Sequence, residues 1–87
     1  MKWTVIWKPL AERTLAELWN ENPARQELTD AANRIDALLK HSADIVGESR
    51  EGNRRILLEP PLGVVYEVNE LDRTVTVLAV WQLPAGS

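Results

Sequence analysis

Three strand-like segments, joined by links too short for a crossover, constrain the fold most. They run from Arg54 to Glu59, from Leu62 to Asn69 and from Thr74 to Trp81. The first link is Pro60-Pro61, and neither proline can donate a ladder hydrogen bond, so the first segment must end there. The second link is a polar turn at residues 70–73. Parallel strands would need a crossover of a dozen residues or more, so the segments predict an antiparallel meander.

Alternation along these segments predicts which side chains share a face of the sheet. In the second segment, Val64, Tyr66 and Val68 alternate with more polar positions. In the third segment the predicted face comprises Val75, Val77, Ala79 and Trp81, with Thr76, Leu78 and Val80 opposite. Trp81 is also expected to form a buried aromatic cluster with Trp3 and Trp7, although four tryptophans could instead provide a stacking platform for bases.

The first third of the chain reads as a strand followed by a helix. Residues from Lys2 to Lys8 alternate, with Trp3, Val5 and Trp7 on one face. Pro9 suits a first helical turn, and a helix of about three turns follows. Its apolar residues recur at helical spacing, namely Leu10, Ala11, Leu15, Leu18 and Trp19.

A second helix is predicted from Asn22 as N-cap and Pro23 as first helical residue. Its stripe consists of Leu28, Ala31, Ala32, Ile35, Leu38 and Leu39, and the helix should end near Lys40 or His41. Residues 41–53 have no period and read as a loop.

The element order βααβββ predicts an α+β fold in which a helical hairpin packs on one face of a small, mainly antiparallel four-stranded sheet. The 87 residues predict one domain, residues 1–87, with 82–87 as a flexible tail. The chain contains no cysteine and so forms no disulfide, and apolar packing must therefore stabilise this small domain.

Composition excludes several classes of function. One histidine, His41, and no cysteine rule out a multi-histidine or thiolate metal centre. The sequence has no Gly-rich phosphate loop, HExxH motif or nucleophile elbow, so no metal and no cofactor is predicted. Apolar runs fall far short of the ~20 residues that span a bilayer, so we expect a cytoplasmic protein without membrane contact. The net charge of −3 argues against affinity gained by covering phosphates with positive charge.

The one concentrated feature is a cluster of three arginines, Arg50, Arg54 and Arg55, where the loop leads into a strand. Arginine forks bind phosphate bidentately, so the cluster beside Tyr66 could hold RNA. A salt-bridged loop is the alternative, because Glu48 and Glu51 lie among the arginines.

Arg54 and Arg55 are adjacent in a strand, so their side chains should point to opposite faces. The inward guanidinium then needs a partner, because an unpaired charge in an apolar core is too costly. Nearby acidic residues for that pairing are Glu48, Glu51 and Glu59.

Four stretches, taken in order, resemble the RelE/ParE superfamily, the toxins of type II toxin-antitoxin modules. They are WTVIWKPLAERTLAELW, the helix ending ANRIDALLK, the run GESREGNRRILLEPPLGVVYEV and the closing DRTVTVLAVW. The match covers residues 2 to about 81. The resemblance implies a bacterial toxin that inhibits growth and is held inactive by a cognate antitoxin, which wraps it with a helix and an extended segment. DNA would be contacted only indirectly, through the antitoxin.

The resemblance also implies site residues. Members that cleave mRNA on the ribosome resemble this chain at Arg54, Arg55 and Tyr66, which implies catalytic roles for Arg55 and Tyr66. Arg50, Arg54 and Arg55 are implied to bind the target or the antitoxin, and the resemblance favours Arg55 as the arginine free to do so.

Two departures bear on the target. Cleaving members carry a basic residue where Gly63 stands here, and an arginine or histidine with a tyrosine near the C-terminus, where this chain has Trp81-Gln82-Leu83-Pro84. The missing side chains would transfer protons or neutralise the transition state. The departures favour a ParE-like, gyrase-poisoning or catalytically weak toxin. A ribosome-dependent mRNA endonuclease and a degenerate, non-toxic antitoxin-binding module are the alternatives.

Overall fold

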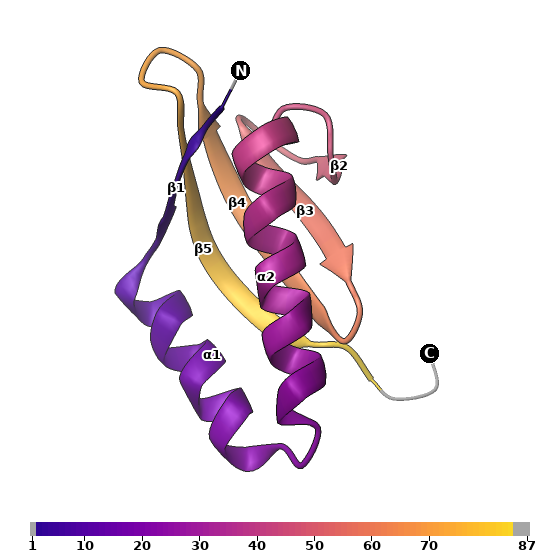
Figure 1. The fold of residues 1–87 in the computed structure, drawn as a ribbon. Helices are drawn as coiled ribbons and strands as arrows, with labels where there is room; N and C mark the ends of the chain where they lie inside the picture. The colour runs from indigo at the N-terminus through magenta and orange to yellow at the C-terminus, as the bar shows by residue number, and fades with distance from the viewer. Residues whose placement is uncertain (1, 85–87) are drawn as a thin grey trace.

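The structure is a computed structural model that describes residues 2–84. Its elements, in chain order, are β1 (Thr4–Trp7), α1 (Pro9–Glu21), α2 (Arg25–Ser42), β2 (Glu48–Ser49), β3 (Arg54–Glu59), β4 (Leu62–Asn69) and β5 (Thr74–Gln82) (Figure 1). The predicted α+β order is confirmed, with the two-residue strand β2 added to it.

All strands belong to one sheet with the order β1-β5-β4-β3-β2. β3, β4 and β5 form the predicted antiparallel meander, and β1 pairs in parallel with β5. The sheet has five strands rather than four, because Glu48 and Ser49 pair antiparallel with β3 inside the segment predicted as a loop. Gly47 and Gly52 have positive φ angles of 73° and 68° and turn the chain on either side of β2. A strand this short shows no periodicity in the sequence.

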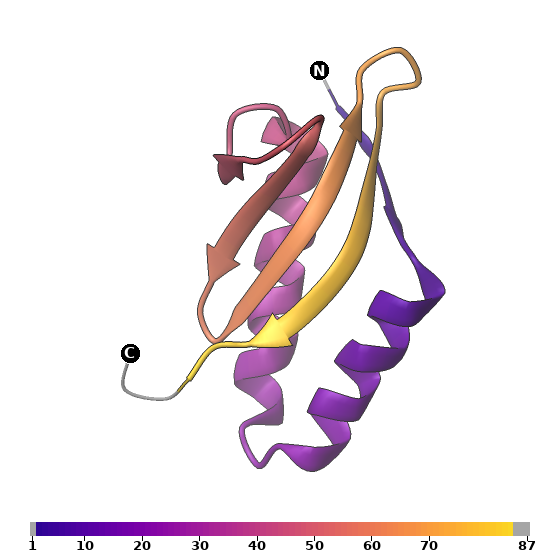
Figure 2. The ribbon, with the colours of Figure 1, turned by 180° about the vertical axis from the view of Figure 1, so that it is seen from behind.

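Both helices lie on one face of the sheet, and in the view from behind β3, β4 and β5 lie in front of α2 (Figures 1 and 2). The buried stripe of α2 consists of Leu28, Ala31, Ile35 and Leu39, which confirms the predicted helix face. The stripe belongs to one buried cluster with the inward side chains of β4 and β5, among them Val64, Tyr66, Val75 and Val77, which are fully buried. In this cluster α2 lies against β3 and β4, and α1 lies against β5. The cluster is the core of the domain.

The ends of α2 differ from the prediction. The helix begins at Arg25, not at Pro23, and it continues to Ser42. Asn22 does not cap the helix, because its Oδ1 accepts a hydrogen bond of 2.8 Å from the Ala24 amide. Asn22 therefore stabilises a turn that precedes the helix.

A β-bulge in β5 changes which residues face the helices. Val65 pairs with Ala79 whereas Tyr66 pairs with Val77, so Leu78 is the extra residue. Beyond it the inward position passes to Val80, and Ala79 and Trp81 face outward. The prediction that these two share the face of Val75 and Val77 is therefore wrong.

The bulge also breaks up the predicted aromatic cluster. Trp3 is buried and Trp7 packs against the core. Trp81 lies on the opposite face, over Gly63, its partner on β4. The three tryptophans therefore do not form one buried cluster.

Residues 82 and 83, which were predicted to belong to a flexible tail, are tied to the sheet. Gln82 is the last residue of β5, and the Leu83 amide donates a hydrogen bond of 2.8 Å to the Pro61 carbonyl oxygen. Residues 85–87 of the predicted tail lie outside the described residues. Among residues 2–84, no helix has the length and apolar character needed to cross a membrane.

Candidate functional site

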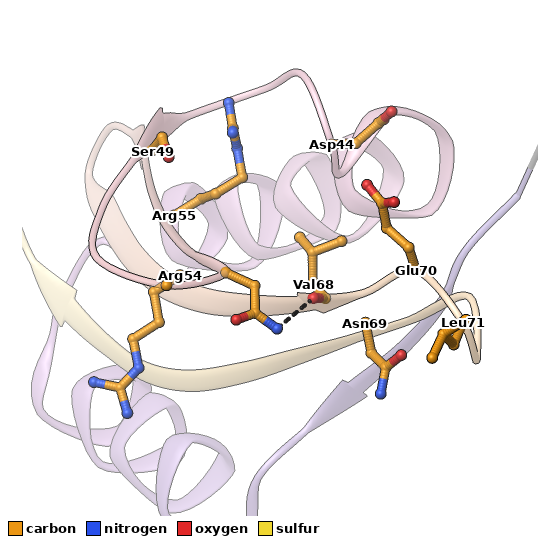
Figure 3. A pocket seen from close by; sticks show the side chains of 10 residues that line it. Asp44, Ser49, Arg54, Arg55, Val68, Asn69, Glu70 and Leu71 are labelled. Atoms are coloured by element: carbon orange, nitrogen blue, oxygen red, sulfur yellow. Dashed lines mark hydrogen bonds between the residues drawn. The ribbon is translucent and has the colours of Figure 1, made fainter.

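Arg54 and Arg55 open β3 and extend in opposite directions from it, as predicted (Figure 3). Arg55 pairs across the sheet with Tyr66 and shares its inward side. Its Nε donates to the Val46 carbonyl oxygen at 2.9 Å and its Nη2 to the Gly47 carbonyl oxygen at 3.0 Å. The expectation that Arg55 is the free arginine is therefore wrong. Backbone carbonyl groups, rather than a carboxylate, satisfy the inward guanidinium.

Tyr66 is fully buried, and its hydroxyl group belongs to the same network. The hydroxyl oxygen lies 2.6 Å from the Val46 carbonyl oxygen and 2.9 Å from that of Ala43. Burial raises the pKa of Tyr66 above its ordinary value, and the Asp44 carboxylate adds to this, whereas the Arg55 guanidinium partly lowers it. The hydroxyl therefore stays protonated at neutral pH and holds the chain that follows α2.

Gly47 allows this segment to approach the sheet. Its φ of 73° is left-handed, and a Cβ there would lie 2.5 Å from the Ile56 carbonyl oxygen. Such a contact is too short for any side chain, so only glycine fits. Residues 43–47 are consequently held against β3 and β4 by two side chains and one close backbone contact.

Arg54 and Arg50 remain at the surface. Arg54 Nε lies 3.5 Å from Glu67 Oε2, and Arg50 Nη2 lies 3.1 Å from Glu48 Oε2. Exposed ion pairs of this kind contribute little stability and exchange readily with solvent. Both arginines therefore form salt bridges, as the second interpretation of the cluster expected. Their guanidinium groups stay accessible to a partner.

A pocket of about 460 Å³ lies beside β3, between the turn that carries Gly52 and the β4–β5 turn (Figure 3). Both Arg54 and Arg55 line it, together with the acidic residues Asp44 and Glu70. Asn53 closes one wall by donating from Nδ2 to the Val68 carbonyl oxygen at 3.0 Å. Charges of both signs meet here, so the pocket is less suited to phosphate than a purely cationic pocket would be.

The face of the sheet away from the helices carries a second feature, which the sequence did not reveal. Trp81 covers Gly63 so closely that a Cβ at Gly63 would lie 2.7 Å from the indole ring. Around this pair the outward positions are apolar, namely Ile56, Leu58, Val65 and Ala79, and Leu58 is 56% exposed. We call these six residues the outer sheet patch. Only the bulge at Leu78 brings Trp81 to this face.

Neither surface contains a metal-binding cluster. Across residues 2–84, no group of three or more histidine, cysteine or acidic side chains is arranged to hold an ion. His41 is exposed in the last turn of α2, where the helix dipole favours a cation.

No protein-family model and no curated protein sequence matches this chain. Solved structures do. The toxin-antitoxin complex RelBE2 from Mycobacterium tuberculosis matches with a TM-score of 0.76 at 21% identity, covering 94% of this chain and 99% of that one. The chromosomal ParDE TA system from P. aeruginosa matches with a TM-score of 0.70 at 15% identity, covering 95% and 98%.

An archaeal RelE-RelB complex from Pyrococcus horikoshii OT3 also matches, with a TM-score of 0.65 at 16% identity, and the match covers 99% of this chain and 100% of that one. Each of these three matches therefore spans nearly the whole of both chains. The similarity that the sequence motifs indicated is confirmed at the level of structure: this chain has the RelE/ParE toxin fold.

Proposed function

We propose that the chain is the toxin of a type II toxin-antitoxin module, that it acts in the bacterial cytoplasm, and that a cognate antitoxin neutralises it. The fold supports this proposal, because similar structures include a toxin-antitoxin complex and a RelE-RelB complex. The sequence motifs lead to the same proposal independently.

We further propose that the toxin binds a protein target, with gyrase as the ParE-like candidate, rather than cleaving RNA. The outer sheet patch is the observation that carries this proposal. Cleaving a phosphodiester needs accessible groups that transfer protons and neutralise developing charge. Here Gly63 and Trp81 stand at the two places where the resemblance implies such groups, and their neighbours are apolar. An exposed apolar surface with an aromatic residue suits a protein contact.

The state of the two residues with implied catalytic roles supports the same proposal. The Tyr66 hydroxyl is buried between carbonyl oxygens, and two nitrogens of Arg55 donate to backbone carbonyl groups. The Tyr66 hydroxyl and the Arg55 guanidinium therefore already form hydrogen bonds within the domain. A catalytic role for either residue remains a prediction, and it would require residues 43–47 to move.

The exposed arginines favour the second candidate function, cleavage of mRNA on the ribosome. Arg50 and Arg54 could bind phosphates after giving up their weak ion pairs. Binding of this kind is strongly weakened by salt, whereas an apolar protein contact is not. A degenerate module that only binds the antitoxin is the third candidate.

The experiment is to induce the chain alone in bacteria and follow the mode of growth arrest. Filamentous cells with an induced DNA-damage response are expected if gyrase is the target. Rapid fragmentation of translated messages would instead assign the chain to the mRNA-cleaving class. As a matched control, Trp81→Ala should weaken the arrest more than Leu71→Ala, because Leu71 is 97% exposed and lies outside the outer sheet patch.

A further inference from the structure

The outer sheet patch continues into a pair of opposite charges on the same face of the sheet, which the helices leave uncovered (Figure 2). Arg54 on β3 and Glu67 on β4 are cross-strand partners, and both point away from the helices. They are the only charged residues among the outward positions of β3, β4 and β5, which lie wholly within the described residues. The face is therefore apolar at Leu58 and charged at Arg54, about 13 Å away at about 3.3 Å per residue.

The two charges are only weakly satisfied within their own chain. Arg54 Nε lies 3.5 Å from Glu67 Oε2, the longest of the ion pairs within residues 2–84. Their side chains are 60% and 44% exposed. Arg54 also borders a hollow of about 560 Å³, together with Arg50 and Val65. A carboxylate from another molecule can therefore approach Arg54 without displacing a buried group.

The pairing of β3 with β4 makes this face self-complementary. The outward cross-strand pairs are Arg54 with Glu67, Ile56 with Val65, and Leu58 with Gly63. A two-fold axis that runs parallel to the strands, between β3 and β4, exchanges the two members of every pair. In a face-to-face contact with this symmetry, Arg54 of each copy lies over Glu67 of the other copy.

The apolar pairs meet in the same arrangement. Ile56 lies over Val65 of the other copy, so the centre of the contact is apolar. Leu58 lies over the Trp81 ring, because that ring covers Gly63. Aromatic side chains at the centre of an interface, with charges at its margin, are typical of protein contacts.

Other two-fold arrangements of this face are unfavourable. An axis perpendicular to the strands would place Arg54 and Glu67 over the apolar residues around Trp81, where both charges lose water and gain no partner. An axis parallel to the strands but centred on β4 would bring Glu67 against Glu67 of the other copy. The charges therefore select the axis between β3 and β4.

We propose that two copies of the chain associate face to face through the outer sheet patch, with Arg54 of each copy paired to Glu67 of the other. Packed sheets lie about 10 Å apart with strand directions within about 30° of each other, which lets the apolar side chains interdigitate. This contact covers the surface assigned above to the protein target, so the two contacts exclude each other. That consequence rests on the proposed function, whereas the dimer itself does not.

The first test measures self-association of the purified chain. Analytical ultracentrifugation from about 10 µM to about 1 mM should show a reversible monomer-dimer equilibrium. NMR resonances that shift with concentration should belong to outward residues of β3, β4 and β5. A monomer at every concentration, or shifts confined to α1 and α2, would overturn the proposal.

Matched leucine variants locate the contact. Leu58 is 56% exposed, so lysine there leaves the core intact but places a charge in the contact. Leu58→Lys should raise the dissociation constant of the dimer at least about tenfold. Leu71→Lys makes the same change at a position that is 97% exposed, in the β4–β5 turn, and should have no effect. Equal dissociation constants for the two folded variants would contradict the assigned surface.

Charge reversal tests the symmetry itself. Arg54→Glu and Glu67→Arg each place like charges over each other, so each variant alone should dimerise at least about tenfold more weakly. An equimolar mixture of the two should dimerise again, because every introduced charge then faces an opposite one. The controls are Arg13→Glu and Glu17→Arg, which make the same charge changes at exposed positions of α1 and should leave the dimer unchanged.

A mixture of the two folded variants that stays monomeric would overturn the arrangement. Growth measurements separate this outcome from the proposed function. A chain that arrests growth but sediments as a monomer refutes the dimer and leaves the toxin role intact. A chain that dimerises as described but does not arrest growth refutes the toxin role and leaves the dimer intact.

Discussion

Arg55 and Tyr66 face each other across β3 and β4 and meet at the same acceptor, the carbonyl oxygen of Val46. Arg55 Nε lies 2.9 Å from that oxygen and the Tyr66 hydroxyl oxygen lies 2.6 Å from it. The pair fastens residues 43–47 to the sheet. The arginine that the family resemblance favoured for binding a partner therefore stabilises the fold, and within the arginine cluster the exposed residues are Arg50 and Arg54.

The buried hydroxyl of Tyr66 makes stability depend on pH at alkaline values. Because burial raises its pKa, the folded chain keeps this proton in a range where the unfolded chain has released it. Its contribution should be complete below the usual tyrosine pKa of about 10 and should be lost as pH rises through the folded pKa. Tyr66→Phe should cost about 1 to 3 kcal/mol at neutral pH, because buried carbonyl groups lose a donor.

Urea unfolding at increasing pH measures this effect, and Tyr66→Phe is the control for the lysines that titrate in the same range. Tyr66 is the only tyrosine of the chain, so tyrosinate absorbance reports its ionisation directly. An alkaline loss of stability that is equal in the two proteins would refute the buried hydroxyl.

The two adjacent arginines should differ in their effect on stability. Arg55→Ala removes two hydrogen bonds from a charged donor to backbone carbonyl groups and should cost about 1.5 to 3 kcal/mol. Arg54→Ala removes one exposed ion pair and should cost less than about 1 kcal/mol. Arg55→Lys should not restore stability, because an ammonium group lacks the planar fork.

Chemical denaturation of the three variants checks this order. A larger loss for Arg54→Ala than for Arg55→Ala would reverse the assignment of inward and outward side chains. If Arg55→Ala unfolds at the wild-type urea concentration yet has lost its toxicity, Arg55 is a functional rather than a structural residue.

Two glycines with similar backbone angles should respond differently to alanine. Gly47 and Gly52 both have positive φ, so alanine is strained at either position by about 1 kcal/mol. Gly52 has open space around its Cα, whereas a Cβ at Gly47 would collide with the Ile56 carbonyl group. Gly47→Ala should therefore cost clearly more, at least about 2 kcal/mol. Melting temperatures give the comparison, and equal shifts would show that the segment adapts without strain.

The buried face of α2 should dominate its contribution to stability. Ile35 is fully buried, so Ile35→Ala should cost about 2 to 5 kcal/mol. Leu38 is only partly buried and should cost less. Arg34, although it binds Glu59 at 2.8 Å, forms an exposed ion pair, so Arg34→Ala should cost at most about 1 kcal/mol. Arg34→Ala and Ile35→Ala variants that melt alike would contradict the helix face.

Periodicity predicted the elements whose burial is one-sided over several turns or residues. The stripe through Ile35 and the alternation through Tyr66 are both of this kind. The bulge at Leu78 was not predictable, because β5 carries apolar residues on both faces. Either register would therefore place apolar side chains toward the helices. The two-residue strand β2 lacks periodicity altogether.

The candidate site was predictable in part. Opposite directions for Arg54 and Arg55 follow from the strand alone. Which of them faces inward depends on register, and its acceptors are carbonyl groups of Val46 and Gly47, which every residue type supplies. The hydrogen bond from Trp19 Nε1 to Thr29 Oγ1 requires α1 and α2 to be placed relative to each other, and no local pattern contains that information.

Colony counts after induction of the chain alone measure whether the chain is a toxin. Viable counts should collapse while the folded chain accumulates, and co-expression of the product of the neighbouring gene should restore them. Undiminished colony formation at a high level of folded protein would refute the proposed toxin function, because a chain that folds and leaves cells unharmed is not a toxin.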